Sequence, residues 1–194
     1  MSTPEALDAG SAPARRLLGA RTVRVLLAAA FLCYPLALGL DYFYVFEPYL
    51  YPLHLMQGRV RPVGRHILIG PYPEYLELER LRARGVTVVI SLLDPRLLYE
   101  KGLIRKEQRY ERSLGMQIYD FPLDSYVSAD SPRNAAHIAS ILAVLKQLGD
   151  RKVYIHCYLG KHRVEYVAQA VRAAAAQAKN SPIPPSADMP PVRP

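Results

Sequence analysis

The chain contains few cysteines, and its basic residues do not follow the pattern of a nucleic-acid-binding module. Its two cysteines, Cys33 and Cys157, lie far apart in a chain of 194 residues, so no disulfide framework is expected. Neither belongs to a CxxC pair or to a Cys/His spacing typical of a metal site, and no cofactor is expected. Because the basic residues are not interleaved with aromatic ones, we set nucleic acid aside as a partner.

Acidic residues are also in deficit. The sequence has 17 Asp and Glu against 25 Lys and Arg, a formal net charge of +8 at pH 7. That excess suits a phosphate-bearing partner or an anionic membrane surface, and it is equally consistent with a role in solubility and membrane topology alone. The length allows one globular domain of about 120–150 residues with appendages.

One long apolar run lies near the N-terminus. It follows residues 1–22, which are small, polar and rich in Pro and Ala, a composition that predicts disorder. The sixteen uncharged residues 25–40 would form a helix of about 24 Å, short of the roughly 30 Å hydrocarbon core. Aromatic residues after Asp41 extend the run into the interface. We therefore predict a membrane anchor at 23–45 and a single-pass membrane location.

Two other interpretations of this run remain open. It could be a cleaved signal peptide, because basic residues precede it and 37–39 (Ala-Leu-Gly) is a passable cleavage site. It could also be a hydrophobic helix packed on the domain, and Pro35 would kink any of these helices. Arginines before the run predict a cytoplasmic N-terminus, whereas arginines after it, such as Arg59, weaken that prediction. The side of the membrane that carries the domain stays open.

The rest of the chain alternates between strand and helix patterns. Residues 46–63 are expected to be an interfacial linker, 64–180 the domain, and the Pro-rich stretch 181–194 a disordered tail. Strands are predicted at 67–69, 86–92, 116–121 and from 153, and helices at 74–84, 97–114, 132–148 and 163–179. The first of these helices should turn Leu76, Leu78 and Leu81 inward. The alternation predicts an α/β fold with a central, mostly parallel sheet and helices on both faces.

The last predicted strand leads into a loop that carries the main chemical signal. A strand, a tight loop and a helix N-terminus together form an anion site, because unpaired N–H groups and the helix dipole both favour negative charge. The loop starts with Cys157 and ends with Arg163, with five residues between them. A thiol in such a field ionises readily and becomes a nucleophile, and a guanidinium can hold two phosphate oxygens in a fork. The loop supplies positioning and charge without a metal.

The sequence His156-Cys157-x-x-Gly160-x-x-Arg163 resembles the signature loop of the cysteine-dependent protein-tyrosine and dual-specificity phosphatases. Its local form, Gly-Lys-His-Arg, looks most like the atypical dual-specificity branch of plants and fungi, whose members act on inositol pyrophosphates or phosphoproteins. The resemblance covers residues 64–180 and implies a dual-specificity phosphatase-like fold. It also implies that Cys157 is the nucleophile and that Arg163 holds the phosphate oxygens. The remaining loop residues are then substrate-binding: His156, Tyr158, Leu159, Gly160, Lys161 and His162.

Within this loop, His156 is expected to orient the backbone from a buried position, while Lys161 and His162 either face the substrate or are solvated loop residues. Three positions depart from the family pattern. Val164 stands where Ser or Thr is usual, Glu165 where Gly is usual, and Leu159 where a small or basic residue is usual. The missing hydroxyl at 164 predicts slow turnover. The alternative to an enzyme is therefore a catalytically weak or inactive phosphate-binding module at the membrane. The alternative to the signature loop itself is a buried structural cysteine beside an unrelated arginine.

A phosphatase of this kind also needs an acid to protonate the leaving oxygen. In the family this acid follows a strand upstream of the cysteine. Asp124 follows the strand predicted at 116–121 and is our choice, with Asp130 and Asp120 as rivals. The predicted function is thus a metal-independent phosphomonoesterase that forms a cysteinyl-phosphate. Its substrate would be a phospholipid head group, by analogy with relatives that act on such lipids, or an inositol phosphate or phosphoprotein.

Overall fold

The computed structural model describes residues 19–50 and 55–180, so the disorder predicted for most of 1–22 and for 181–194 lies outside the described residues. The chain divides into two compact units, 1–39 and 40–194. Among the described residues one helix, α1 (Ala20–Asp41), is long and apolar enough to cross a membrane, although a signal sequence or a core helix can meet the same criterion. The helix ends at Asp41, earlier than predicted, because Tyr42 leaves the helical conformation before α2 (Phe43–Phe46).

The second unit is built on a five-stranded sheet in the order β1-β2-β5-β3-β4. Its strands are β1 (Arg61–Pro62), β2 (Ile67–Gly70), β3 (Val86–Ser91), β4 (Gln117–Asp120) and β5 (Lys152–His156). Strands β2, β5, β3 and β4 run parallel, and β1 pairs antiparallel with β2 at the edge. The predicted mostly parallel α/β sheet is therefore confirmed. β5 occupies the centre, so the loop that follows it opens between β2 and β3.

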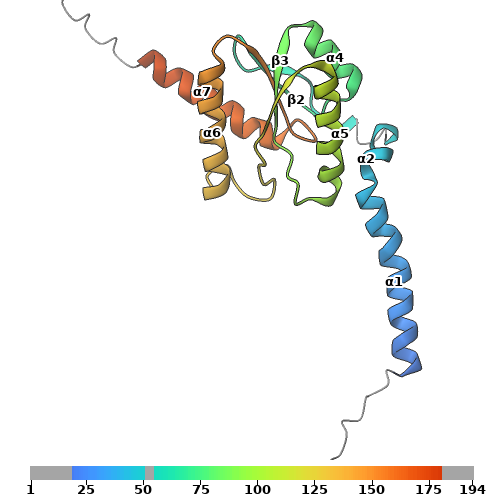
Figure 1. The fold of residues 1–194 in the computed structure, drawn as a ribbon. Coiled ribbons are helices and arrows are strands. Elements are labelled where there is room, and N and C mark those ends of the chain that lie inside the picture. Colours follow the sequence, from blue (N-terminus) through green and yellow to red (C-terminus); the bar gives the residue numbers. More distant parts are fainter. Residues whose placement is uncertain (1–18, 51–54, 181–194) are drawn as a thin grey trace, which may run out of the picture. The chain divides into compact units, whose positions relative to one another are not determined.

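Helices cover both faces of the sheet (Figure 1). On one face lie α4 (Tyr75–Ala83) and α5 (Leu98–Leu114), which pack on β3 and β4. On the other lie α6 (Pro132–Leu148) and α7 (His162–Asn180), whose buried residues join the central strands in the larger core cluster. The four helices therefore support the central strand β5 and the loop that follows it.

Local sequence signals explain where these helices begin and end. The Ser131 side chain accepts a hydrogen bond from the Asn134 amide and Pro132 opens α6, as predicted. Gly115 ends α5 in the left-handed conformation, with φ of 64°. The prediction for α4 was wrong at Leu76, which is 61% exposed, whereas Leu78 and Leu81 are buried. Positions 78 and 81 share a helix face, and position 76 lies on another.

The stretch expected to be a linker packs onto the domain over part of its length. It contains the edge strand β1 and the short 3₁₀ helix η1 (Glu47–Tyr49), in which the Glu47 side chain is buried. Just before it, α2 packs against α5, and Phe43 and Tyr44 contact a small buried cluster that includes Tyr158. The structured domain therefore starts well before residue 64.

Candidate active site

The end of β5 and the loop that follows it, residues 156–161, are braced through their carbonyl groups. The carbonyls of His156, Tyr158 and Leu159 accept hydrogen bonds from backbone amides at 2.9, 3.1 and 2.7 Å; the donors are Leu92, Tyr72 and Gly58 respectively. In contrast, the amides from Tyr158 to Arg163 donate to no acceptor in the described part of the chain. A loop that engages its carbonyls and leaves its amides free, at a helix N-terminus, is built to bind an anion.

Gly160 makes this tight loop possible. Its φ is +65°, a conformation that side chains rarely adopt, and a Cβ there would collide with the backbone of Gly70 and Pro71. A Cβ at Gly58 would likewise collide with the carbonyl oxygen of Gly160, so this position also has no space for a side chain. The loop therefore packs directly on the backbones of the segments beside it, and this contact fixes its path.

Arg163 lies at the start of α7 and is only 4% exposed. Its Nη1 donates to Leu92 O at 2.9 Å and to Glu100 Oε2 at 2.9 Å, and its Nη2 donates to Glu100 Oε1. Burial by itself would lower the pKa of Arg163, but the hydrogen bonds and charge of Glu100 outweigh it and raise the pKa. Arg163 is therefore a permanent cation.

Glu100 occupies only one edge of this guanidinium. The two carboxylate oxygens bind the edge formed by Nη1 and Nη2, while Nε donates no hydrogen bond to any residue within 19–50 or 55–180. The side edge, formed by Nε and the second hydrogen of Nη2, remains available. A guanidinium binds two oxygens of a tetrahedral anion through such an edge. Glu100 thus fixes the orientation of the guanidinium, so that the free edge of Arg163 can bind an anion from one direction.

Cys157 follows β5 directly and is 3% exposed, in the core cluster that also contains Leu92, Leu123 and Val164. Arg163 donates to the carbonyls of Leu92 and Leu123, two residues of this same cluster, so the guanidinium and Cys157 adjoin the same part of the core. The structure therefore brings the thiol, the free guanidinium edge and the unpaired amides into one site.

A row of buried acids lies behind the loop. Glu100, Glu107 and Glu111 all point inward from α5, and His156, which is fully buried, lies with Nε2 against Glu107 Oε1. Burial and the charge of Arg163 lower the pKa of His156 to about 3. Burial also raises the pKa of Glu107 and, together with the charge of Glu107, that of Glu111. At neutral pH, His156 and Glu107 thus form a neutral contact, not an ion pair.

Asp124 lies on the segment after β4, next to Arg163. The carbonyl of Leu123, the preceding residue, accepts a hydrogen bond from Arg163 Nη1 at 3.4 Å. The Asp124 side chain accepts hydrogen bonds from the Tyr126 amide at 2.9 Å and from Arg96 Nη2 at 3.0 Å. These contacts, the Tyr126 amide first, lower the pKa of Asp124. In this arrangement Asp124 is an ionised carboxylate held by Arg96.

The two rival acids lie elsewhere. Asp120 ends β4 and accepts a hydrogen bond from Gln108 Nε2 of α5 at 3.0 Å, and Asp130 is exposed just before α6. In the rest of the loop, Lys161 and His162 are exposed and Leu159 is half-buried. Among the described residues no group of three or more His, Cys, Asp and Glu is arranged to hold a metal ion.

The structure explains two of the three departures from the family pattern. Val164 is fully buried in the core beneath the loop, so an apolar side chain fits there. Glu165 contacts Arg61 of β1 and accepts a hydrogen bond from Arg172 at 3.0 Å, so it ties α7 to the edge strand. We find no structural reason for Leu159.

Two features of the site escaped the sequence analysis. The first is the partner of Arg163: only the spacing of Glu100, Glu107 and Glu111 hints that three acids share one helix face. The second is an aromatic contact from α2. The Phe43 ring lies edge-on to Tyr158 of the loop, with centroids 5.9 Å apart, and to Tyr99 at 5.8 Å. The loop after β5 is thus packed against the segment that directly follows α1.

Comparison with known proteins finds similar structures only at the level of the fold. No protein-family model and no curated protein matches the sequence significantly. Two crystal structures of a candidate phosphatase (DUF442) from Shewanella putrefaciens match with TM-scores of 0.52 and 0.53, at 19% and 20% identity. They cover 61% and 64% of this chain and 72% and 74% of the other chain.

The core catalytic domain of the PP-IP phosphatase SIW14 from S. cerevisiae, in complex with citrate, matches with a TM-score of 0.49. Its identity is 16%, over 60% of this chain and 66% of that chain. The fold of this chain, a five-stranded mixed sheet flanked by helices, is therefore the phosphatase-like fold of the Shewanella protein.

Proposed function

We propose that the chain is a phosphomonoesterase of the dual-specificity and tyrosine phosphatase class, with Cys157 as nucleophile. One observation carries the proposal: the loop that begins with Cys157 and ends at Arg163 leaves its amides from Tyr158 to Arg163 unpaired within residues 19–50 and 55–180, and one edge of the Arg163 guanidinium stays free. Donors arranged in this way stabilise the charge on the three equatorial oxygens of a transferring phosphoryl group. The phosphatase-like fold supports the same assignment.

The reaction proceeds in two displacements. The Cys157 thiolate attacks phosphorus, so the S–P bond forms as the P–O bond to the leaving group breaks, and the leaving oxygen takes a proton from Asp124. Water then attacks phosphorus and gives its proton to the Asp124 carboxylate, and the S–P bond breaks to release inorganic phosphate and the thiolate. Arg163 holds two phosphate oxygens throughout, and Glu100 keeps its fork aimed at the phosphate.

Asp124 must change partners to act as the acid. The Tyr126 amide and Arg96 hold it ionised in this structure, and Arg96 also binds Asp94 through both carboxylate oxygens. A phosphate dianion bound near Asp124 would raise its pKa and attract Arg96 away from it. Binding of the substrate would then convert Asp124 from an ion-paired carboxylate into a proton donor.

We further propose that α1 anchors the domain in a membrane and that the substrate is a phosphorylated lipid head group. Phe43 supports this, because it lies two residues beyond the end of α1 and contacts Tyr158 of the signature loop. If α1 crosses a bilayer, the active-site loop is tied through this contact to the membrane interface. Inositol phosphates and phosphoproteins are the competing substrate classes.

The test is hydrolysis of p-nitrophenyl phosphate by the full chain in detergent. We expect turnover that EDTA does not reduce. Cys157→Ser should abolish it while phosphate-analogue binding persists, because a serine hydroxyl does not ionise at neutral pH. Turnover by Cys157→Ser equal to that of the wild type would exclude the thiol mechanism, and a strict requirement for a divalent ion would exclude metal independence.

The second candidate function is a catalytically weak or inactive phosphate-binding module. The buried Val164 favours it, since no hydroxyl stands beside the thiol at that position to assist breakdown of the phosphoenzyme. Vanadate binding by a wild-type chain that shows no turnover of the aryl ester would establish this alternative.

A further inference from the structure

Helix α5 separates its charges between two faces. Its three glutamates point into the domain, where Glu100 holds Arg163 and Glu107 lies against His156. Its outer face is basic. The exposed cations recur at helical spacing: Lys101, Arg105, Arg109 and Arg112. Because the acids of the helix are turned inward, they leave this outer face with an uncompensated positive charge.

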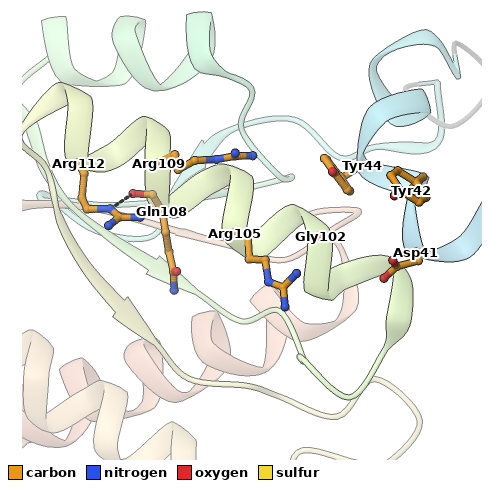
Figure 2. A pocket seen from close by; sticks show the side chains of 8 residues that line it. All are labelled: Asp41, Tyr42, Tyr44, Gly102, Arg105, Gln108, Arg109 and Arg112. Carbon is orange, nitrogen blue, oxygen red and sulfur yellow. Dashed lines mark hydrogen bonds between the residues drawn. The ribbon is translucent and has the colours of Figure 1, made fainter.

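This basic face forms one wall of a cavity of about 470 Å³ (Figure 2). In Figure 2 the side chains of Arg105 and Arg109 extend from α5 toward the side where Asp41, Tyr42 and Tyr44 lie. Among the described residues, Asp41 is the one acidic residue that lines the cavity. Neither Arg105 nor Arg109 makes a hydrogen bond or ion pair with another residue of 19–50 or 55–180. The cavity therefore presents free guanidinium groups beside tyrosine rings.

The geometry of this cavity is set by packing. A Cβ at Gly102 would collide with the Tyr44 ring, so the ring lies directly on the backbone of α5. One residue earlier, Phe43 lies edge-on to Tyr99 of the same helix, with centroids 5.8 Å apart. The tyrosine wall and the arginine wall thus belong to one packed unit, and the cavity between them is a fixed feature of the domain.

If α1 spans a bilayer, chain connectivity places the cavity near the membrane surface. Asp41, which lines it, is the last residue of α1, so if α1 spans a bilayer this residue lies at the boundary with water. The segment that follows exposes large apolar and aromatic side chains. They are Tyr42, Val45, Phe46 and Tyr49. Such side chains are typical of the interfacial layer of a bilayer, and arginines beside them meet lipid phosphates.

We propose that the cavity and the basic face of α5 bind the head groups of anionic phospholipids in the membrane that α1 anchors. A guanidinium pairs with a phosphate through two parallel hydrogen bonds, and a basic residue close to an anionic leaflet is attracted to it. The lipid bound here is a docking ligand, distinct from the substrate at Cys157. The inference rests on the proposed membrane anchorage and does not depend on turnover.

The test is arginine-selective chemical footprinting of the full chain in lipid nanodiscs, with labelling rates read by mass spectrometry. We compare phosphatidylcholine discs, discs that also contain phosphatidylglycerol, and phosphatidylcholine discs with added inorganic phosphate. Labelling of Arg105 and Arg109 should slow about fivefold in the anionic discs, the factor that corresponds to the attraction of one basic residue to an anionic surface. Arg82 and Arg133, exposed on α4 and α6, should label at the same rate in all three samples.

A matched pair of variants separates site binding from general charge. Arg105→Gln/Arg109→Gln should remove the protection of Arg112, and Arg82→Gln/Arg133→Gln, with the same change in net charge, should leave the protection of Arg105 and Arg109 in place. Equal labelling in neutral and anionic discs overturns the proposal, as does equal protection of Arg82 and Arg133. Full protection of Arg105 and Arg109 by inorganic phosphate alone would show that the cavity is a site for free anions and overturn the proposal of a lipid site. A chain that does not insert into discs refutes the anchorage and this inference with it, whereas insertion without protection refutes this inference alone.

Discussion

Val164 is the residue that we expect to limit turnover most directly. It lies next to Arg163, where related loops have a hydroxyl, and its side chain is fully buried with Cys157 in the same core cluster. Val164→Thr keeps the shape of the side chain and adds a hydroxyl that can donate to the leaving thiolate. We expect faster breakdown of the phosphoenzyme, seen as a smaller pre-steady-state burst and a higher steady-state rate. Identical bursts and steady-state rates in both proteins would show that this step does not limit turnover.

The contribution of Asp124 to kcat should be larger for substrates whose leaving group departs poorly without a proton. A positioned general acid contributes about 10²–10⁴ in rate. Asp124→Asn should therefore lower kcat by about that factor on alkyl phosphates, whose alkoxide leaves poorly without a proton. The loss should be small on p-nitrophenyl phosphate, because nitrophenolate needs no proton. The measurement is kcat for both esters at several pH values, and the decline of the alkyl rate at high pH caused by deprotonation of the acid should disappear.

Asp130→Asn is the control for this experiment, because Asp130 is exposed and lies before α6. Its effect should be small and independent of the leaving group. If Asp130→Asn instead shows the loss on alkyl esters and Asp124→Asn does not, the acid is Asp130, and the thiol mechanism still stands. If neither variant shows it, the acid comes from outside the segment that follows β4.

At the scale of the element, α5 and β5 share a buried network whose protonation should control stability. Burial lowers the pKa of His156 to about 3 from 6.5, so this group favours the folded state increasingly as pH rises from about 3 to 6.5 and adds nothing further above that. Burial raises the pKa of Glu107 above 4.5, so the folded state keeps a proton that the unfolded state loses. Glu107 therefore contributes its full stabilisation of the folded state below pH 4.5, and this contribution falls as pH rises.

Above about pH 6.5 the free energy of unfolding should therefore decline, because only the buried glutamates of this network still act. Glu107→Gln should reduce the slope by up to about 1.4 kcal/mol per pH unit, which corresponds to one proton, and Glu111 should account for part of the slope that remains. Tyrosine fluorescence during chemical denaturation measures this in a chain without tryptophan. Glu79→Gln, an exposed change on α4, should leave the slope unchanged. A Glu107→Gln slope parallel to the wild type would refute the buried protonated state.

The elements that the sequence predicted are those with strong local signals. Ser131 with Pro132, and Gly115, marked helix ends by capping chemistry that acts within a few residues. The edge strand β1 has two residues, one of them Pro62, and no periodicity can mark so short a strand. The loop from Cys157 to Arg163 was predictable because its residues are contiguous. Glu100 was not predictable as the partner of Arg163, because the two meet only through the tertiary fold, 63 positions apart.

At the scale of the whole molecule, the proposed membrane anchorage of the active site depends on a short stretch of chain. Asp41 ends α1, Phe43 contacts Tyr158, and Tyr44 lies on Gly102. These contacts were not predicted, because the sequence analysis assigned residues 41–44 to the membrane anchor at 23–45. Because α2 is packed on the domain, little free chain separates α1 from the active-site loop. If α1 anchors the chain as proposed, we expect the loop to act on a lipid in the same bilayer and not on one in another bilayer.

This geometry predicts a strict dependence on where the substrate is presented. The full chain in nanodiscs should hydrolyse a long-chain phospholipid monoester, such as phosphatidic acid, when the lipid shares its disc, and should release little phosphate when the same lipid is in separate discs. A water-soluble short-chain analogue should be hydrolysed equally in both arrangements, which controls for inhibition by the discs. Cys157→Ser should be inactive throughout. Equal release from shared and separate discs would refute action on lipids in the anchoring membrane and leave the phosphatase assignment intact. Hydrolysis of the soluble analogue alone would direct the search to inositol phosphates and phosphoproteins.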